Sequence, residues 1–506
     1  MAVATGTMGQ QAMPQDAPQI RLGGYAAMAE SAWMGSVQAT EVLEPARTAL
    51  RLPRAPLQLR GLLTREFSIA EASFILMASF FLSAALGAVR QVLFNAQFGI
   101  GTEANAYYAA FRLPDTLFSL IAGGALSSAM IPVLLRTIRE DGEDSGWRLI
   151  NLVLTVLLAV FAVVVLAGEL FAPAFVNGLL APGFDAETSQ LTVTLTRIML
   201  VQPLILAVGS VATAVLNSRN QFLLTALSVV SHNVALISGI LAARFFPDLG
   251  IYGPTLGVVG GAVLQVLILA PGMFGRGVSF RPIFDLFSRR LRELVALLVP
   301  NGLSVSVNYA GFIVDTSYAS RAAEIAGLPA IYNAWLLVGL PIALLGQAVG
   351  QATFPRLAAS AAAEDWPRMR QTLIRSLGAA VALAIPALLA LLFLGRPVIR
   401  ILFERGKFTA EAGDLTFDVL IAYAVALPAY VATEVITRGL IALRDTRTPL
   451  LTNILQLAGR IVFMALLVGG IGVIAIPAAL AVTATLETIT LGTVILFKLR
   501  RRMAPA

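Results

Sequence analysis

Long apolar segments separated by short polar connections fill the chain from residue 68 to residue 498. A helix needs about 20 mainly apolar residues to cross a bilayer. About twelve segments reach that length, so the pattern predicts an all-α polytopic membrane protein with about twelve transmembrane helices. The predicted spans are 68–98, 103–137, 147–177, 188–217, 220–245, 250–274, 290–320, 329–359, 368–402, 411–443, 448–469 and 472–498.

The two halves of this region resemble each other. The segment SAMIPVLLR, with Pro132, resembles QATFPRLAA, with Pro355, and LNSRNQFLLT at 216–225 resembles ALRDTRTPLLT at 442–452. An even number of predicted helices separates equivalent points, so both halves keep the same orientation in the membrane. Parallel repeats of this kind build transporters that rock two lobes around a central site.

The repeat defines the expected domains. We expect an N-lobe at 66–274 and a C-lobe at 290–498, each of about six helices, joined by a basic linker at 275–289. Residues 1–65 contain no apolar run long enough to span and are expected to form a flexible tail, and 499–506 a short C-terminal tail. Alternate connections are rich in arginine, which predicts that both termini lie in the cytoplasm.

Composition excludes several other classes of protein. The chain is 58% hydrophobic and 13% charged, with mean hydropathy +0.81, which excludes a soluble domain. It has no cysteine and one histidine, which excludes disulfides, thiolate chemistry and multi-histidine metal sites. Because its arginines lie at helix ends, the net charge of +7 does not indicate nucleic acid.

No sequence feature indicates catalysis. The chain has no nucleotide-binding loop and no nucleophile-base set. We therefore expect a transporter rather than an enzyme, without cofactor or metal, and driven by an ion gradient or the membrane potential.

Two arginines stand inside otherwise apolar segments. Arg90 lies in the first predicted span and Arg112 in the second. An ionised group near the bilayer centre costs at least about 2.5–3.5 kcal/mol, so it normally faces a hydrated cavity or a partner. The two positions therefore predict a positively charged interior surface that suits an anion.

A second set of polar residues occupies the seventh predicted span. Asn301, Asn308 and Asp315 recur every seven residues and so share one face of a helix. We expect that face to line the cavity and to contact substrate. The alternative is that these side chains form hydrogen bonds between helices, as polar groups in membrane proteins often do. The same alternative applies to Arg197, Glu434, Arg438, Arg460 and Glu487.

Seven motifs occur in order along the chain: LGAVRQVLFNAQFG, AFRLPD, LAPGF at 180–184, LTRIML at 195–200, LGVVGGAVLQVLILAP, RGKFT at 405–409 and LRDTRTP at 443–449. They resemble the motifs of the MurJ/MviN family of the MOP exporter superfamily, whose members flip lipid II for peptidoglycan synthesis in the cell inner membrane. The resemblance implies two six-helix lobes forming a V around a cationic cavity that opens alternately to the two sides. It implies an undecaprenyl-pyrophosphate-linked substrate whose tail stays in the lipid bilayer.

The family's pattern also identifies positions in this chain. Arg90 and Arg112 match cavity positions of the family, and Asn105 stands where the family has an acid at the start of the second helix. Other charged cavity positions of the family are occupied by uncharged residues here. Gly123 takes the place of an acidic residue, and Trp335 and Leu336 take the place of an Asp-Arg pair. The resemblance further implies two additional helices in many members, which are not expected in this chain.

Three functional hypotheses follow. The first is an alternating-access flippase for lipid II, with Arg90 and Arg112 facing the pyrophosphate. The second is an exporter of another polyprenyl-pyrophosphate-linked saccharide. The third, which the replaced charges favour, is a transport-inactive scaffold that recruits cell-wall synthesis proteins.

Overall fold

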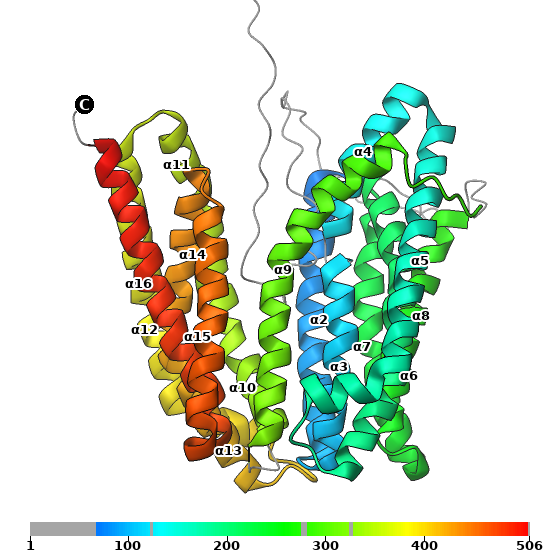
Figure 1. Ribbon diagram of the computed structural model, residues 1–506, viewed down its shortest axis with the longest axis vertical. Helices are drawn as coiled ribbons and strands as arrows, with labels where there is room; N and C mark the ends of the chain where they lie inside the picture. The colour runs from blue at the N-terminus through cyan, green and yellow to red at the C-terminus, as the bar shows by residue number, and fades with distance from the viewer. Residues whose placement is uncertain (1–66, 122–124, 275–280, 323–326, 504–506) are drawn as a thin grey trace, which may run out of the picture.

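The computed structural model describes residues 67–121, 125–274, 281–322 and 327–503, and within them every regular element is helical (Figure 1). The expected tail at 1–65 and part of the expected linker lie outside the described residues. The first half of the described chain contains α2 (Ile69–Phe98), α3 (Thr102–Ile121), α4 (Ala125–Asp141), α5 (Glu143–Phe175), η2 (Val176–Leu180), α6 (Ala186–Ser218), α7 (Phe222–Phe245), η3 (Pro247–Leu249) and α8 (Tyr252–Phe274).

The second half interrupts several predicted spans. The expected span at 329–359 is α10 and α11 with a π-helical segment between them, and the span at 411–443 is two helices. The elements are α9 (Arg289–Arg321), α10 (Gly327–Pro341), η4 (Ile342–Gln347), α11 (Ala348–Ala362), α12 (Trp366–Leu402), α13 (Ala410–Val425), α14 (Leu427–Ala442), α15 (Arg447–Ile471), η5 (Gly472–Ile474) and α16 (Ala475–Met503).

By length and composition, eight helical segments of the described chain can cross a membrane, or nine if α13 and α14, bent by 41°, form one span. One of the eight, Arg447–Met503, contains both α15 and α16. Helices α3 and α9 are not among them. In α3, Arg112 and other polar residues interrupt the apolar run. The count of about twelve spans stays a prediction.

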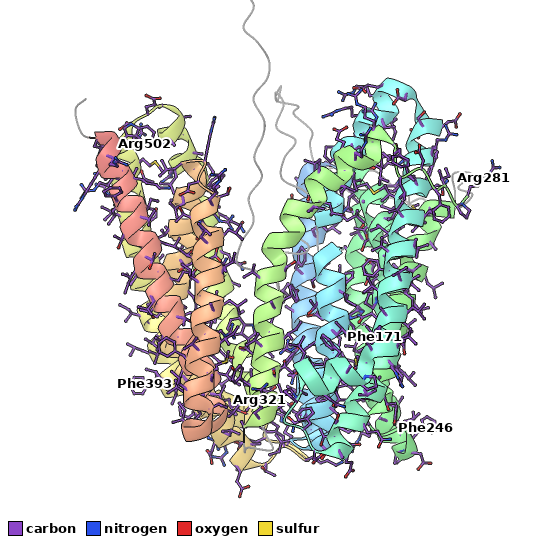
Figure 2. The ribbon with its side chains drawn as sticks, viewed as in Figure 1. Phe171, Phe246, Arg281, Arg321, Phe393 and Arg502 are labelled. Carbon is purple, nitrogen blue, oxygen red and sulfur yellow. The ribbon has the colours of Figure 1, made fainter. Side chains whose placement is uncertain are left out.

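The helices form two bundles that meet at one end and diverge toward the other (Figure 1). Helices α2–α8 make one bundle and α10–α16 the other, with α9 between them. The outer faces carry large apolar side chains: Figure 2 shows Phe246 and Phe393 at opposite outer edges, and they are 66% and 75% exposed. Apolar residues at this exposure suit contact with lipid rather than water.

Helix α9 is attached to both bundles. Near its N-terminus, Arg290 pairs with Glu140 and Asp141 of α4 at 2.6 and 2.8 Å, and Leu291 packs into the core that α4 and α5 form. Near its C-terminus, Asp315 pairs with Arg460 of α15. The expected division of the chain into lobes stays a prediction, because α9, the first helix of the expected C-lobe, also packs on the N-terminal bundle.

Glycines join the bundles where they meet. The backbone N–H of Lys407 donates to the carbonyl of Ala96 at the end of α2, with an N···O distance of 2.8 Å. Gly99 and Gly406 have φ of +63° and +58°, and a Cβ on either would collide with the opposite backbone. We call Ala96, Gly99, Gly406 and Lys407 the glycine contact. It explains the glycines in the NAQFG and RGKFT motifs, since only glycine tolerates both constraints.

A buried cluster of amides reinforces this junction. The side chain of Asn333 on α10 accepts hydrogen bonds from Gln91 and Asn95 on α2, at 2.7 and 2.9 Å. Gln91 also donates to the hydroxyl of Tyr108 on α3. Because hydrogen bonds are stronger away from water, this fully buried network specifies how the two bundles align.

Candidate functional site

A cavity of about 220 Å³, here called the larger cavity, lies between α9 and the C-terminal bundle. It is lined by residues of α9, α10, η4, α13, α14, α15 and α16, and Arg112 reaches it from α3. Its aromatic lining consists of Phe312, Tyr332, Trp335, Tyr423 and Tyr430. Its polar lining includes Arg112, Asp315, Gln347, Thr433, Glu434, Asn453, Gln456, Arg460 and Glu487. The cavity therefore combines apolar walls with a few charged and amide groups, as small-molecule sites do.

Arg112 is held by aromatic rings rather than by a carboxylate. Its guanidinium carbon lies 5.3 Å from the ring centre of Phe312 and 5.6 Å from that of Tyr332. The side chain is 6% exposed, and among the described residues its Nε has no hydrogen-bond partner and no ion pair involves it. Cation–π contacts fix the position of the group without neutralising its charge, so Arg112 keeps a full positive charge at the cavity.

Asp315 and Arg460 form an ion pair in the cavity wall. The contact joins Nη2 of Arg460 to Oδ2 of Asp315, and both residues are buried. Gly311, one helical turn before Asp315, leaves room for the guanidinium, because a Cβ there would lie 3.1 Å from Nη1 of Arg460. Within the described chain, Nε of Arg460 and Oδ1 of Asp315 have no partner. The pair is therefore joined through one oxygen and one nitrogen only.

The remaining buried charges of this bundle are also partnered. Nη2 of Arg438 lies 3.7 Å from Oε2 of Glu434, one turn earlier on α14. Oε1 of Glu487 accepts a hydrogen bond from Oγ1 of Thr452 at 3.1 Å. Asp315 and Glu434 are thus each paired with an arginine, whereas no ion pair of Arg112 is found in the described residues; the nearest acid on its own helix is Asp115, one turn away, whose carboxyl interacts with the Arg112 charge.

Arg90 belongs to a separate, smaller cavity of about 20 Å³. That space is lined by Arg90, Tyr107, Tyr108 and Tyr332, among others. Nη1 of Arg90 donates to Oδ1 of Asn233 at 3.3 Å, across from α2 to α7. A cavity of this size holds a water molecule but no phosphate group. Only the ring of Tyr332 lines both cavities, so Arg90 and Arg112 do not face one common space in this conformation.

The predicted site residues are thus partly brought together. Arg112 and Asp315 both line the larger cavity, which Arg90 does not reach. Asn105 is buried in α3 and lines neither cavity. Asn301 and Asn308 lie on α9, but their side chains lie outside the described residues. A role of these residues in binding stays a prediction.

Much of the cavity lining has only a weak signal in the sequence. Pairing between helices is one of two alternatives for Arg460, Glu434 and Glu487, and Arg460 pairs with Asp315 of α9 while also lining the cavity. Their position inside apolar segments was the available signal. The aromatic residues Tyr423 and Tyr430 gave no signal, because rings at helical spacing usually fill cores.

The comparisons with known proteins agree on one family and one fold. The family model described as "Lipid II flippase MurJ" matches residues 94–503. The lipid II flippase MurJ of Burkholderia cenocepacia is 32% identical over 378 residues, which cover 73% of this chain and 72% of that protein. A solved structure titled "Lipid II flippase MurJ, inward closed conformation" matches with a TM-score of 0.70 at 23% identity, covering 84% of this chain and 87% of the other.

A second solved structure extends the likeness to the superfamily. An inward-facing MATE family transporter of the MOP superfamily matches with a TM-score of 0.69 at 15% identity, covering 83% of this chain and 94% of the other. These matches confirm the predicted all-α, two-bundle MOP-type fold.

Proposed function

This chain belongs to the MurJ family of lipid II flippases, and we propose that it moves lipid II across the membrane by alternating access between the two bundles. The observation that carries the proposal is Arg112, a buried arginine on the larger cavity for which no ion pair is found in the described residues. A pyrophosphate offers the negative charge that this residue lacks.

The geometry supports an anionic headgroup next to an apolar tail. A guanidinium presents a planar fork of donors that matches phosphate oxygens, and such charge-assisted bonds are about twice as strong as neutral ones. Phe312 and Tyr332 hold this fork in place before the substrate arrives, which reduces the entropy lost on binding. The polyprenyl tail stays against the apolar outer faces and needs no protein cavity of its own.

We also propose the orientation of the protein. Arg281 and Arg502 lie at the end where the bundles diverge (Figure 2), and arginine accumulates on the cytoplasmic side of membrane proteins. The described conformation then opens toward the cytoplasm of the inner membrane, where lipid II is made, and the glycine contact lies on the far side. An ion gradient or the membrane potential supplies the energy.

A second candidate function differs from the first only in the headgroup of the lipid-linked substrate. Trp335 and Leu336 line the larger cavity where the resemblance implies an Asp-Arg pair. An aromatic-aliphatic pair in place of two charges favours a less charged headgroup. The second candidate function is therefore export of another polyprenyl-pyrophosphate-linked saccharide.

The test is complementation of a strain depleted of its lipid II flippase, with membrane insertion checked by immunoblot. We expect rescue by wild type and loss of rescue with Arg112→Ala. The matched control is Arg197→Ala, since Arg197 also lies in an apolar segment but lines neither cavity. Its side chain is 46% exposed, and its Nε lies 3.8 Å from Oε2 of Glu169. We expect this variant to rescue.

Two results would overturn parts of the proposal. Full rescue by Arg112→Ala would remove the arginine from substrate binding. Failure of well-inserted wild type, together with transport of a different polyprenyl-linked saccharide in proteoliposomes, would replace lipid II by that saccharide.

A further inference from the structure

Trp335 stands at the centre of an aromatic cluster in the wall of the larger cavity. Its ring centre lies 5.3 Å from that of Tyr423 and 6.3 Å from that of Tyr430, at interplanar angles of 66° and 87°. The ring centre of Phe312 lies 6.1 Å from that of Trp335, at an interplanar angle of 74°. Edge-to-face contacts of this kind are favourable and fix the plane of the central ring. The indole is only partly buried, so its remaining surface contributes to the cavity.

Three primary amides line the same cavity without partners in the described chain. They are the side chains of Gln347 in η4 and of Asn453 and Gln456 on α15. Asn453 is 7% exposed, and Gln347 and Gln456 are half-buried. Buried polar groups normally have hydrogen-bond partners, and each primary amide offers two donors and one acceptor oxygen. These groups are therefore available to a bound molecule.

The charged groups nearby do not favour a second ion. Asp315 is paired with Arg460, and Glu434 with Arg438. Beside Arg112, the paired acids Asp315 and Glu434, the fixed aromatic plane and the available amides suit an uncharged ring with an apolar face and several hydroxyl groups. A hexopyranose has this chemistry: its axial C–H groups pack on an aromatic plane, and its hydroxyl groups bond to amides.

The size of the cavity limits what it can hold. A cavity of about 150 Å³ holds a benzene-sized ring. The larger cavity, at about 220 Å³, therefore has room for one substituted six-membered ring but not for a complete disaccharide with its peptide. Arg112 lines the same space, which is the placement required when a sugar is bonded directly to a phosphate.

We propose that the larger cavity is a subsite for the single hexopyranose ring attached to the pyrophosphate. The ring packs on Trp335, its hydroxyl groups bond to Asn453, Gln456 and Gln347, and the phosphate contacts Arg112. This inference rests on the proposed function, because it assumes a polyprenyl-pyrophosphate-linked substrate. It adds that this chain recognises the sugar as well as the charge.

The experiment compares two lipids that differ only in the headgroup. The full chain in nanodiscs is titrated with lipid II and with undecaprenyl pyrophosphate, which has the same tail and pyrophosphate but no sugar. Wild type should bind lipid II more tightly. Trp335→Leu and Gln456→Ala should each weaken lipid II binding by about tenfold and leave binding of undecaprenyl pyrophosphate unchanged. Arg112→Ala should weaken both.

Controls separate the subsite from folding and from the proposed function. Trp147→Leu removes a tryptophan that contacts Arg219 outside both cavities and should change neither affinity. Gln456→Ala removes an amide that has no hydrogen-bond partner among the described residues, so it tests the subsite even if Trp335→Leu fails to fold. Equal wild-type affinities for the two lipids, or equal weakening of both by the subsite variants, would refute the sugar subsite alone. Wild type that binds neither lipid would refute the proposed function, and the subsite with it.

Discussion

The ion pair between Asp315 and Arg460 offers a direct test of how this bundle tolerates buried charge. The two residues are 4% and 7% exposed and belong to helices far apart in the chain, α9 and α15. Arg460→Met removes the positive charge at similar length. It leaves the Asp315 carboxylate buried, and no other described arginine or lysine forms an ion pair with it.

The magnitude follows from the cost of an uncompensated charge. Removing one partner of a buried pair destabilises a protein by about 3–5 kcal/mol, whereas replacing both partners by apolar groups is often neutral. We therefore expect Arg460→Met and Asp315→Leu each to lower the free energy of unfolding by about 3 kcal/mol or more. The double variant should be close to wild type. The pair contacts through one oxygen and one nitrogen, so the double variant loses little attraction.

The assay is equilibrium unfolding in mixed detergent micelles, followed by tryptophan fluorescence for wild type, both single variants and the double variant. The four measurements form a double-mutant cycle, which isolates the coupling between the two side chains. Because the readout is folding, the result does not depend on transport. Single variants as stable as wild type, or a double variant as unstable as the sum of the singles, would refute the reasoning.

Three further predictions follow from other features. Gly406→Ala should lower the population in which the bundles meet, because the added Cβ collides with the backbone of Ala96. Faster proteolysis in the 403–409 loop would show this. Gly469→Ala, whose Cβ meets open space, is the control. Asn333→Leu should destabilise the protein by about 1–3 kcal/mol by leaving the Gln91 amide buried with fewer partners; an unchanged unfolding curve would contradict this. Asp445→Asn should destabilise the protein at neutral pH but not in strong acid. Burial raises the pKa of the Asp445 carboxyl, but hydrogen bonds from Lys498 and Thr448 outweigh burial and hold the pKa below the ordinary 3.8. The carboxylate therefore contributes stability above pH 3.8, and this contribution is lost as the pH falls through the folded-state pKa. A stability difference that persists below that pKa would contradict this assignment.

The helices were largely predictable because their apolar length is a local property. The expected span at 290–320 is α9, at Arg289–Arg321. The two similar segments also share a backbone feature: the connections after α6 and α14 each contain a left-handed residue, Asn220 at φ 58° and Arg444 at φ 60°. A turn of this type is encoded by a few neighbouring residues, so similar sequences give similar geometry.

The site was less predictable because it depends on how helices rotate against one another. The sequence identifies Arg90 and Arg112 as intramembrane charges, but the direction each side chain takes is decided by packing. Arg90 bonds to Asn233, 143 residues away, and Arg112 lies between Phe312 and Tyr332. The pairing of Arg460 with Asp315, 145 residues apart, has no local signature either.

The two attachments of α9 respond differently to ionic strength. The pairs that join Arg290 and Arg136 to acidic partners involve side chains that are between 19% and 53% exposed, so dissolved salt screens them, with a Debye length of about 8 Å at physiological concentration. The pair between Asp315 and Arg460 is only 4% and 7% exposed, so dissolved salt screens it less. Added salt therefore weakens the hold of α4 on this helix more than the hold of α15, and shifts the balance of its two attachments toward the C-terminal bundle.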